Sequence, residues 1–120
     1  MKLAYQNPIP VAAHRGNAAY FPENTMASFR SAAELKPDMI ETDVHMTRDG
    51  ELILMHDHTV DRTTNGTGLI REKTLAEMRA LDAGSWKDET FRGEKVPTFR
   101  EFLEYFSSIL PRLSRYALQY

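Results

Sequence analysis

The sequence predicts an α/β fold in which short buried strands alternate with amphipathic helices. Residues Ile9–Ala13 form a short apolar run, and a segment with a helical apolar stripe follows it. A second strand-like stretch then begins at Met39. A buried strand, a helix and a second strand in this order are typical of a parallel βα unit. The 120 residues allow at most one domain, which is long enough for a real hydrophobic core.

The first predicted strand, Ile9–Ala13, ends at His14-Arg15-Gly16. Gly16 allows the backbone to turn away directly after two polar side chains. In α/β barrels the functional residues follow the strands at this position. We therefore interpret His14 and Arg15 as candidate functional residues.

The first predicted helix follows a loop that runs from Asn17 to Pro22. Asn24 or Thr25 can cap this helix, and we expect Asn24 to be a cap that shapes the loop rather than a catalytic group. Pro37 prevents the helix from continuing. Its apolar stripe contains Met26, Phe29 and Ala33.

The stretch Met39–Asp57 contains the most informative pattern of the chain. In an extended strand alternate side chains share a face, so Glu41 and Asp43 point the same way. Two carboxylates on one face repel each other unless a cation or a proton lies between them. Glu41 and Asp43 are therefore candidate ligands of a metal ion.

Asp49-Gly50 lies between two strand-like runs and predicts a hairpin turn. If the two runs pair antiparallel about this turn, His56 lies across from Thr42 or Asp43. If the second run instead enters a parallel sheet, the folded barrel has to bring His56 to the carboxylates. Both arrangements indicate a site for a hard metal ion with an acid/base group beside it.

The segment after His56 is expected to be less regular. Asp57–Gly68 is rich in Thr, Asn, Asp and Gly and is typical of a structured loop. Thr74 and Glu77 form a capping box for a short helix that ends near Gly84.

A second capping box, Thr98 with Glu101, precedes a helix whose apolar stripe contains Phe99, Phe102, Leu103 and Phe106. The remaining residues, 107–120, include no acidic residue, although the preceding chain carries all 17. Pro111 breaks the helix, and nothing after it alternates as a strand should. We interpret 107–120 as an atypical tail that arose by truncation or a frame shift.

The overall composition excludes several classes of function. The formal net charge of −2 provides no basic surface for nucleic acid, and the absence of cysteine excludes disulfides and thiolate metal sites. No apolar run is long enough to span a membrane. The first ten residues contain one lysine and no apolar core of a secretory signal, so we expect a cytoplasmic protein.

Several motifs, taken together and in this order, resemble the glycerophosphodiester phosphodiesterase family. They are His14-Arg15-Gly16, Pro22-Glu23-Asn24-Thr25, Glu41-Thr42-Asp43, His56-Asp57, Asp61-Arg62-Thr63-Thr64-Asn65-Gly66 and Val96-Pro97-Thr98. The resemblance implies that residues 1–106 are the N-terminal part of a (β/α)₈ TIM barrel of the phospholipase C-like phosphodiesterase type. A small insertion, at about 57–95, would follow the second catalytic histidine.

The resemblance also implies metal-dependent hydrolysis of glycerophosphodiesters to glycerol 3-phosphate and an alcohol. By motif match, Glu41 and Asp43 are ligands of a divalent cation, Mg²⁺ or Ca²⁺, His14 and His56 are the acid/base pair, and Arg15 contacts the phosphate. In the family mechanism the 2-hydroxyl of glycerol attacks phosphorus, and water opens the resulting cyclic intermediate.

These residue types suit that chemistry. Arginine matches phosphate oxygens with a planar fork, and carboxylate oxygens suit Mg²⁺ or Ca²⁺. Two histidines that titrate near neutral pH can exchange the protons that the reaction moves.

In one respect the chain departs from the family. The family takes a third acidic ligand from the strand after the Phe-rich helix, whereas this chain has no acidic residue beyond Glu104. The sequence therefore also allows a non-catalytic remnant, or a weak cation binder that needs a partner. A further alternative is a sphingomyelinase D-like enzyme, which also carries Glu-x-Asp and two histidines, although the motifs at Pro22–Thr25 and Asp61–Thr64 count against it. Open barrel edges predict self-association.

Overall fold

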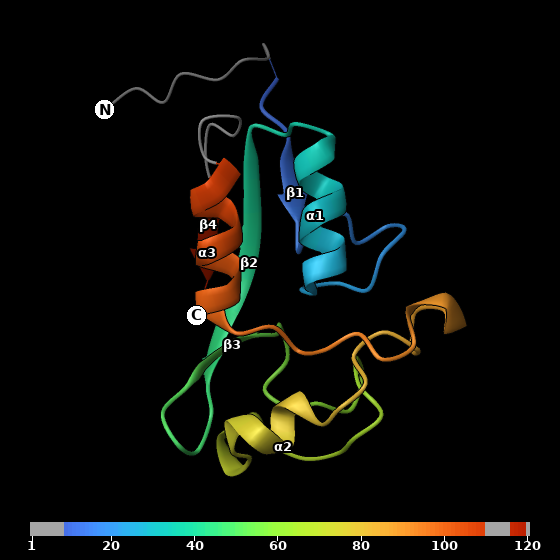
Figure 1. Cartoon of the computed structure of the whole chain (residues 1–120), viewed down its shortest axis with the longest axis vertical. Helices are drawn as coiled ribbons and strands as arrows, with labels where there is room; N and C mark the ends of the chain where they lie inside the picture. Colours follow the sequence, from blue (N-terminus) through green and yellow to red (C-terminus); the bar gives the residue numbers. More distant parts are fainter. Residues whose placement is uncertain (1–8, 110–115, 120) are drawn as a thin grey trace.

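The computed structural model describes residues 9–109 and 116–119. Its elements, in chain order, are β1 (Ala12–His14), α1 (Met26–Glu34), β2 (Met39–Met46), β3 (Leu52–Leu54), the 3₁₀ helix η1 (Ile70–Glu72), α2 (Leu75–Arg79), the 3₁₀ helix η2 (Glu89–Phe91), α3 (Phe99–Ile109) and β4 (Tyr116–Gln119) (Figure 1). Within the described ranges no helix combines the length and apolar character that crossing a bilayer requires.

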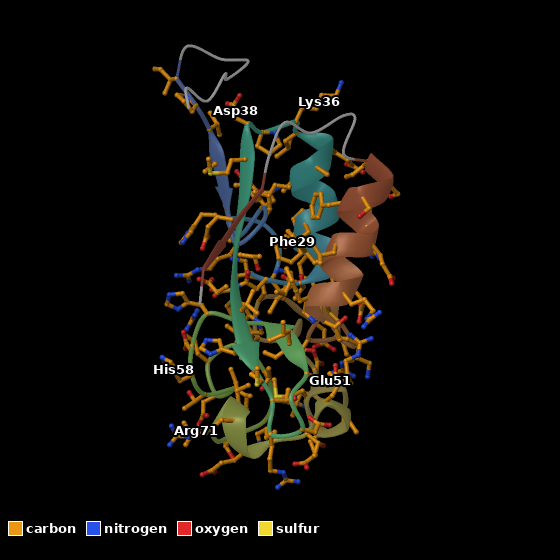
Figure 2. The ribbon with its side chains drawn as sticks, turned by 90° about the vertical axis from the view of Figure 1, so that its left-hand side faces the viewer. Phe29, Lys36, Asp38, Glu51, His58 and Arg71 are labelled. Atoms are coloured by element: carbon orange, nitrogen blue, oxygen red, sulfur yellow. The ribbon has the colours of Figure 1, made fainter. Side chains whose placement is uncertain are left out.

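The central strand of the sheet is β2. β1 pairs with it in parallel, from Ala12↔Met39 to His14↔Glu41, so the predicted parallel βα unit is confirmed. β3 pairs with the far end of β2 in antiparallel register, which confirms the predicted hairpin. The helices α1 and α3 lie side by side over one face of the sheet (Figures 1 and 2). This is the α/β architecture of the N-terminal part of a TIM barrel.

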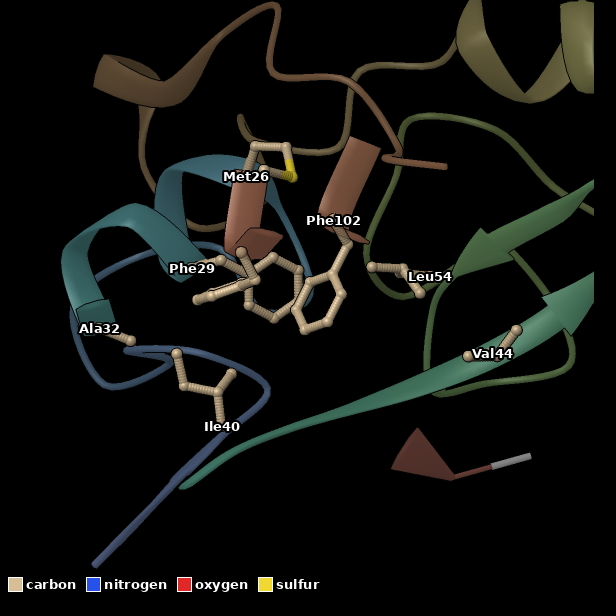
Figure 3. Packing of buried hydrophobic residues seen from close by; sticks show 8 residues of the cluster. Met26, Phe29, Ala32, Ile40, Val44, Leu54 and Phe102 are labelled. Atoms are coloured by element: carbon tan, nitrogen blue, oxygen red, sulfur yellow. The ribbon is translucent and has the colours of Figure 1, made fainter. Parts of the chain in front are cut away.

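The main hydrophobic core lies between these helices and β2 (Figure 3). Phe29 of α1 contacts Phe102 of α3 edge to face, with ring centroids 4.8 Å apart. Ile40 and Val44 of β2 belong to the same core. Because side chains alternate along a strand, the odd-numbered residues of β2 point to the opposite face of the sheet. The helices thus leave the other face of β2 for polar side chains.

The segment after β3 packs a smaller core of its own, formed by Ile53, Met55, Val60, Ile70, Met78, Ala83 and Val96. The capping boxes are confirmed, since Thr74 accepts a hydrogen bond from the N–H of Glu77 and Thr98 accepts one from that of Glu101. However, α2 ends at Arg79 and not near Gly84. The Asp82 carboxylate accepts hydrogen bonds from the N–H groups of Gly84 and Ser85, and these turn the chain before another helical turn forms.

The expected start of the first strand is wrong by three residues. β1 begins at Ala12 rather than Ile9. The N–H of Val11 donates to the Asp38 carboxylate at 2.8 Å instead of to a neighbouring strand. An apolar run therefore does not by itself mark where sheet pairing begins.

A strand forms after Pro111, although the sequence there does not alternate as a strand should. Tyr116–Gln119 form β4, which pairs in parallel with β2 from Ile40↔Tyr116 to Asp43↔Gln119. The expected start of the tail, residue 107, falls inside α3, which continues to Ile109. Backbone groups along an edge of β2 can pair with any extended segment, and this does not require alternating side chains. That residues 107–120 arose by truncation or a frame shift stays a prediction.

Candidate functional site

The turn after β1 lies against the start of the acidic strand. His14 is the register partner of Glu41, and its Nε2 lies 3.5 Å from Glu41 Oε2. Arg15 and Gly16 have φ angles of 59° and 84°, so the chain turns away sharply. A Cβ at Gly16 would clash with Ser28 of α1. The turn directs the Arg15 N–H to Glu41, with distances of 2.9 Å to its carbonyl oxygen and 3.2 Å to Oε2.

Glu41 and Asp43 lie on the face of β2 that points away from the helices, and both are buried. Burial raises the pKa of Glu41, and the negative charge of Asp43 raises it further. Nε of Arg15 lies 3.7 Å from Asp43 Oδ2. The two carboxylates therefore repel each other, as the alternation of side chains along the strand predicts, and the guanidinium of Arg15 lies beside them.

Thr25 is the residue that caps α1. Its side chain accepts a hydrogen bond from the Ser28 N–H at 3.3 Å. The expectation that Asn24 serves as a cap is wrong. Asn24 has a φ of 55°, in the left-handed region that asparagine tolerates better than most residues, and this directs its side chain elsewhere.

Asn24 instead contacts the acidic strand and is 2% exposed. Its Nδ2 donates to Asp43 Oδ2 at 3.1 Å, and its Oδ1 accepts the Thr42 hydroxyl at 2.8 Å. β1 ends opposite Glu41, so Thr42 and Asp43 of β2 have no partner residue in β1. Asn24 occupies that place and holds one oxygen of Asp43, a role that the sequence analysis did not assign.

His56 follows the hairpin. The N–H of Met55 donates to the Asp43 carbonyl at 3.0 Å. The register Val44↔Leu54, continued by two residues, places His56 opposite Thr42, one of the two positions expected for it. His56 is exposed, and its Nδ1 lies 3.0 Å from Asp57 Oδ1.

Arg62 connects the surroundings of His56 to those of Arg15. Its guanidinium donates to both oxygens of Glu23, at 2.8 and 3.0 Å, and to both oxygens of Asp57, at 2.9 and 3.0 Å. Glu23 also accepts from Arg15 Nη1 at 3.1 Å. The side chains therefore form a continuous series, Arg15–Glu23–Arg62–Asp57–His56.

These contacts keep both carboxylates of the series ionised. Burial raises the pKa of Glu23, but the hydrogen bonds and charges of Arg62 and Arg15 outweigh it and lower the pKa overall. The hydrogen bond from Arg62 holds the pKa of Asp57 well below its usual range. Glu23 and Asp57 are thus charged partners of the two arginines near neutral pH.

Only two metal ligands, Glu41 and Asp43, are predicted. Across 9–109 and 116–119, no set of three or more His, Cys, Asp or Glu side chains is arranged to hold a metal ion. The oxygens of Glu41 and Asp43 are nevertheless the donors that Mg²⁺ and Ca²⁺ prefer, and Mg²⁺ commonly binds through one or two carboxylates while keeping several waters. The donor set therefore fits a hydrated hard cation.

The structure thus brings four of the five predicted site residues into contact with one another: His14, Arg15, Glu41 and Asp43. His56 is linked to them through the series that contains Arg62. The supporting roles of Glu23, Asp57 and Arg62 were missed, although each stands in a motif. A useful signal was Arg62 itself, a large cation in a loop otherwise rich in Thr, Asn and Gly.

Comparisons with known proteins agree with this geometry. Residues 14–111 match the model of the "Glycerophosphoryl diester phosphodiesterase family". A glycerophosphodiester phosphodiesterase of Caldanaerobacter subterraneus is 52% identical over 94 residues, which are 78% of this chain and 39% of that protein. A glycerophosphodiester phosphodiesterase structure from Agrobacterium tumefaciens has a TM-score of 0.83 at 39% identity, covering 92% of this chain and 47% of its own.

A phosphodiesterase from Oleispira antarctica, solved in complex with the product sn-glycerol-3-phosphate, has a TM-score of 0.77 at 38% identity and covers 92% of this chain and 45% of its own. The chain spans about 40% of the length of the curated relatives it matches. The family model covers most of the chain, and the fold and motif order agree with it. The chain therefore belongs to the glycerophosphodiester phosphodiesterase family of enzymes, and it has the fold of the N-terminal part of their barrel.

Proposed function

We propose that this chain forms the catalytic N-terminal part of a metal-dependent phosphodiesterase that hydrolyses glycerophosphodiesters to glycerol 3-phosphate and an alcohol. The observation that carries the proposal is the cluster at the ends of β1 and β2. There Glu41 contacts His14, and Asp43 lies beside Arg15, each pair within 4 Å. Such a cluster offers a cation site, a phosphate contact and a proton carrier side by side.

Arg15 is suited to contact the phosphate. Its Nε is buried and has no hydrogen-bond partner among the described residues. This nitrogen faces Asp43, whereas the side chain as a whole is 19% exposed, so the outer part of the guanidinium is accessible to a phosphate oxygen. Glu23 holds the other end of the guanidinium through Nη1 and so fixes the direction of the fork.

Glu41 and Asp43 would hold Mg²⁺ or Ca²⁺, which when bound supplies positive charge that offsets the anionic phosphodiester. Asn24 keeps Asp43 oriented through its amide. Which of the two metals is used depends on the number of ligands that complete the site.

His14 and His56 would move the protons. One imidazole removes the proton from the glycerol 2-hydroxyl as its oxygen attacks phosphorus, and the other donates a proton to the alcohol oxygen as the P–O bond breaks. A water molecule then opens the cyclic phosphodiester with the two roles exchanged, which restores both imidazoles. His56 is suited to this because one of its nitrogens is held by Asp57.

The proposed function is tested in a complete barrel. Residues 1–106 are joined to the C-terminal part of a related full-length enzyme, and release of glycerol 3-phosphate is measured. General acid/base groups contribute about 10²–10⁴-fold, so His14→Ala and His56→Ala should each lose at least about 10²-fold. The exposed His58 provides the matched control, and His58→Ala should retain the rate. A His56→Ala graft with a near-normal rate would refute the acid/base pair.

The second candidate function is a non-catalytic remnant or weak cation binder that needs a partner. It is favoured because, among the described residues, no third His, Cys, Asp or Glu side chain joins Glu41 and Asp43 to complete a metal site. The family match favours glycerophosphodiesters over the sphingomyelinase D-like alternative. The cytoplasmic location and self-association through barrel edges stay predictions.

A further inference from the structure

We propose that Arg62 is a positioning residue for the reaction: by bridging Glu23 and Asp57 it orients His56 and keeps its neutral imidazole protonated at Nδ1, so that Nε2 is the reactive nitrogen. This inference rests on the proposed function and assigns a role to a residue outside the predicted acid/base pair. It explains how an exposed histidine after the hairpin can keep a fixed orientation.

The geometry of Arg62 is that of a two-sided clamp. Nη1 and Nη2 donate to the two oxygens of Glu23, while Nε and Nη2 donate to the two oxygens of Asp57. Paired, nearly parallel N–H···O bonds fix both the distance and the plane of each carboxylate. Glu23 and Asp57 are 34 positions apart in the chain, so the clamp joins the loop before α1 to the end of the hairpin.

Asp57 transmits this constraint to His56. Asp57 Oδ1 accepts from Arg62 Nη2 at 2.9 Å and lies 3.0 Å from His56 Nδ1. A carboxylate that is ionised can only accept, so the neutral imidazole presents Nδ1–H to it. A fixed partner on one ring nitrogen sets the tautomer and the ring orientation, and it leaves the other nitrogen for chemistry.

The clamp is more than an ordinary surface ion pair. Isolated exposed pairs contribute little, and the Arg62 side chain is 45% exposed. However, the side chain of Glu23 is only 10% exposed, and the low pKa of Asp57 is due mainly to Arg62. A lysine at this position would keep the charge, but it lacks the planar fork that satisfies two carboxylates at once.

The experiment uses the complete 120-residue chain labelled with ¹⁵N. Two-bond ¹H–¹⁵N spectra recorded at about pH 8, where histidine is mostly neutral, distinguish the Nδ1–H from the Nε2–H tautomer. His56→Gln assigns the signals. We expect at least about a tenfold excess of Nδ1–H at His56 in the wild type. Arg62→Gln and Arg62→Lys should each reduce that excess at least about threefold.

Arg71→Gln is the matched control, because Arg71 is an exposed arginine of the same segment between β3 and α3 and is not part of the clamp. It should leave His56 unchanged, and the rings of His45 and His58, which contact each other, should be unchanged in every variant. A predominant Nε2–H tautomer in the wild type overturns the proposal. The proposal is also overturned if Arg62→Lys or Arg62→Gln keeps the same excess of the Nδ1–H tautomer at His56 as the wild type. If the glutamine variant does not fold, Arg62→Lys decides the question. The spectra require no turnover, so a negative result here is separate from a failure of the proposed activity.

Discussion

At the scale of single residues, Glu41 and Asp43 are expected to bind a divalent cation. Isothermal titration of the chain with Mg²⁺ and with Ca²⁺ should show binding, and Glu41→Gln with Asp43→Asn should abolish it, because carboxylate oxygens are the donors. Glu34→Gln with Glu104→Gln removes the same charge from exposed helix positions and should leave binding intact. Unchanged binding in the first double variant would remove the metal assignment.

Glu41 should also destabilise the fold when no cation is present. Its pKa is raised in the folded state, so folding favours the protonated form, and this contribution is lost as the pH rises through the folded-state pKa. Glu41→Gln mimics that form. Without divalent cations its melting temperature at pH 7 should be at or above that of the wild type, and the difference should shrink below about pH 4. A clearly lower melting temperature at pH 7 would contradict this.

Single-residue roles could be predicted where they depend on local pattern. That Glu41 and Asp43 share a face follows from the alternation of side chains along a strand. The structure confirms that neither belongs to the core beneath the helices. The role of Asn24 could not be predicted, because it depends on β1 ending opposite Glu41 and leaving a place beside Asp43. Sequence spacing does not determine where a neighbouring strand stops.

At the scale of elements, β4 adds a parallel neighbour to β2, with Ala117 as the register partner of Glu41.

The helices and the hairpin could be predicted because their signals are local. The capping residues Thr74 and Thr98 mark where α2 and α3 begin, and Asp49-Gly50 marks the turn of the hairpin. β4 escaped prediction because its pairing depends on the edge that β2 offers and not on a pattern of its own. The early end of α2 escaped as well, since it depends on hydrogen bonds that the Asp82 side chain accepts from the backbone.

At the scale of the whole molecule, we predict that the 120-residue chain alone has no glycerophosphodiesterase activity above a His14→Ala control. Among the described residues β1 pairs only with β2, so its outer edge has no strand beside it to extend the wall of the site. A site with an incomplete wall neither fixes the ligand geometry nor strengthens its electrostatics. Metal-dependent release of glycerol 3-phosphate by a monodisperse monomer would show that the rest of the barrel is dispensable.

The same unpaired edge of β1 should favour self-association. Val11, Tyr20 and Leu35 lie around β1 and α1 and are 54%, 76% and 70% exposed. Exposed apolar side chains beside an unpaired strand edge promote pairing between chains. Light scattering coupled to gel filtration should show a mass above 13.8 kDa that rises with concentration. Val11→Lys with Leu35→Lys should lower it, whereas Arg30→Lys should not.

The distances along the chain between paired segments have a consequence for the order of folding. The β2–β3 hairpin joins Met46 to Leu52, and a hairpin of this kind forms in about 1–10 μs. The contact between Glu23 and Arg62 instead closes a loop of 39 residues. Closing a long loop costs conformational entropy before the contacts that it brings together can compensate. We therefore expect the hairpin with its carboxylates to form early, and His14 and His56 to be joined only late. The proposed acid/base pair would then be among the first parts of the molecule to separate when it unfolds.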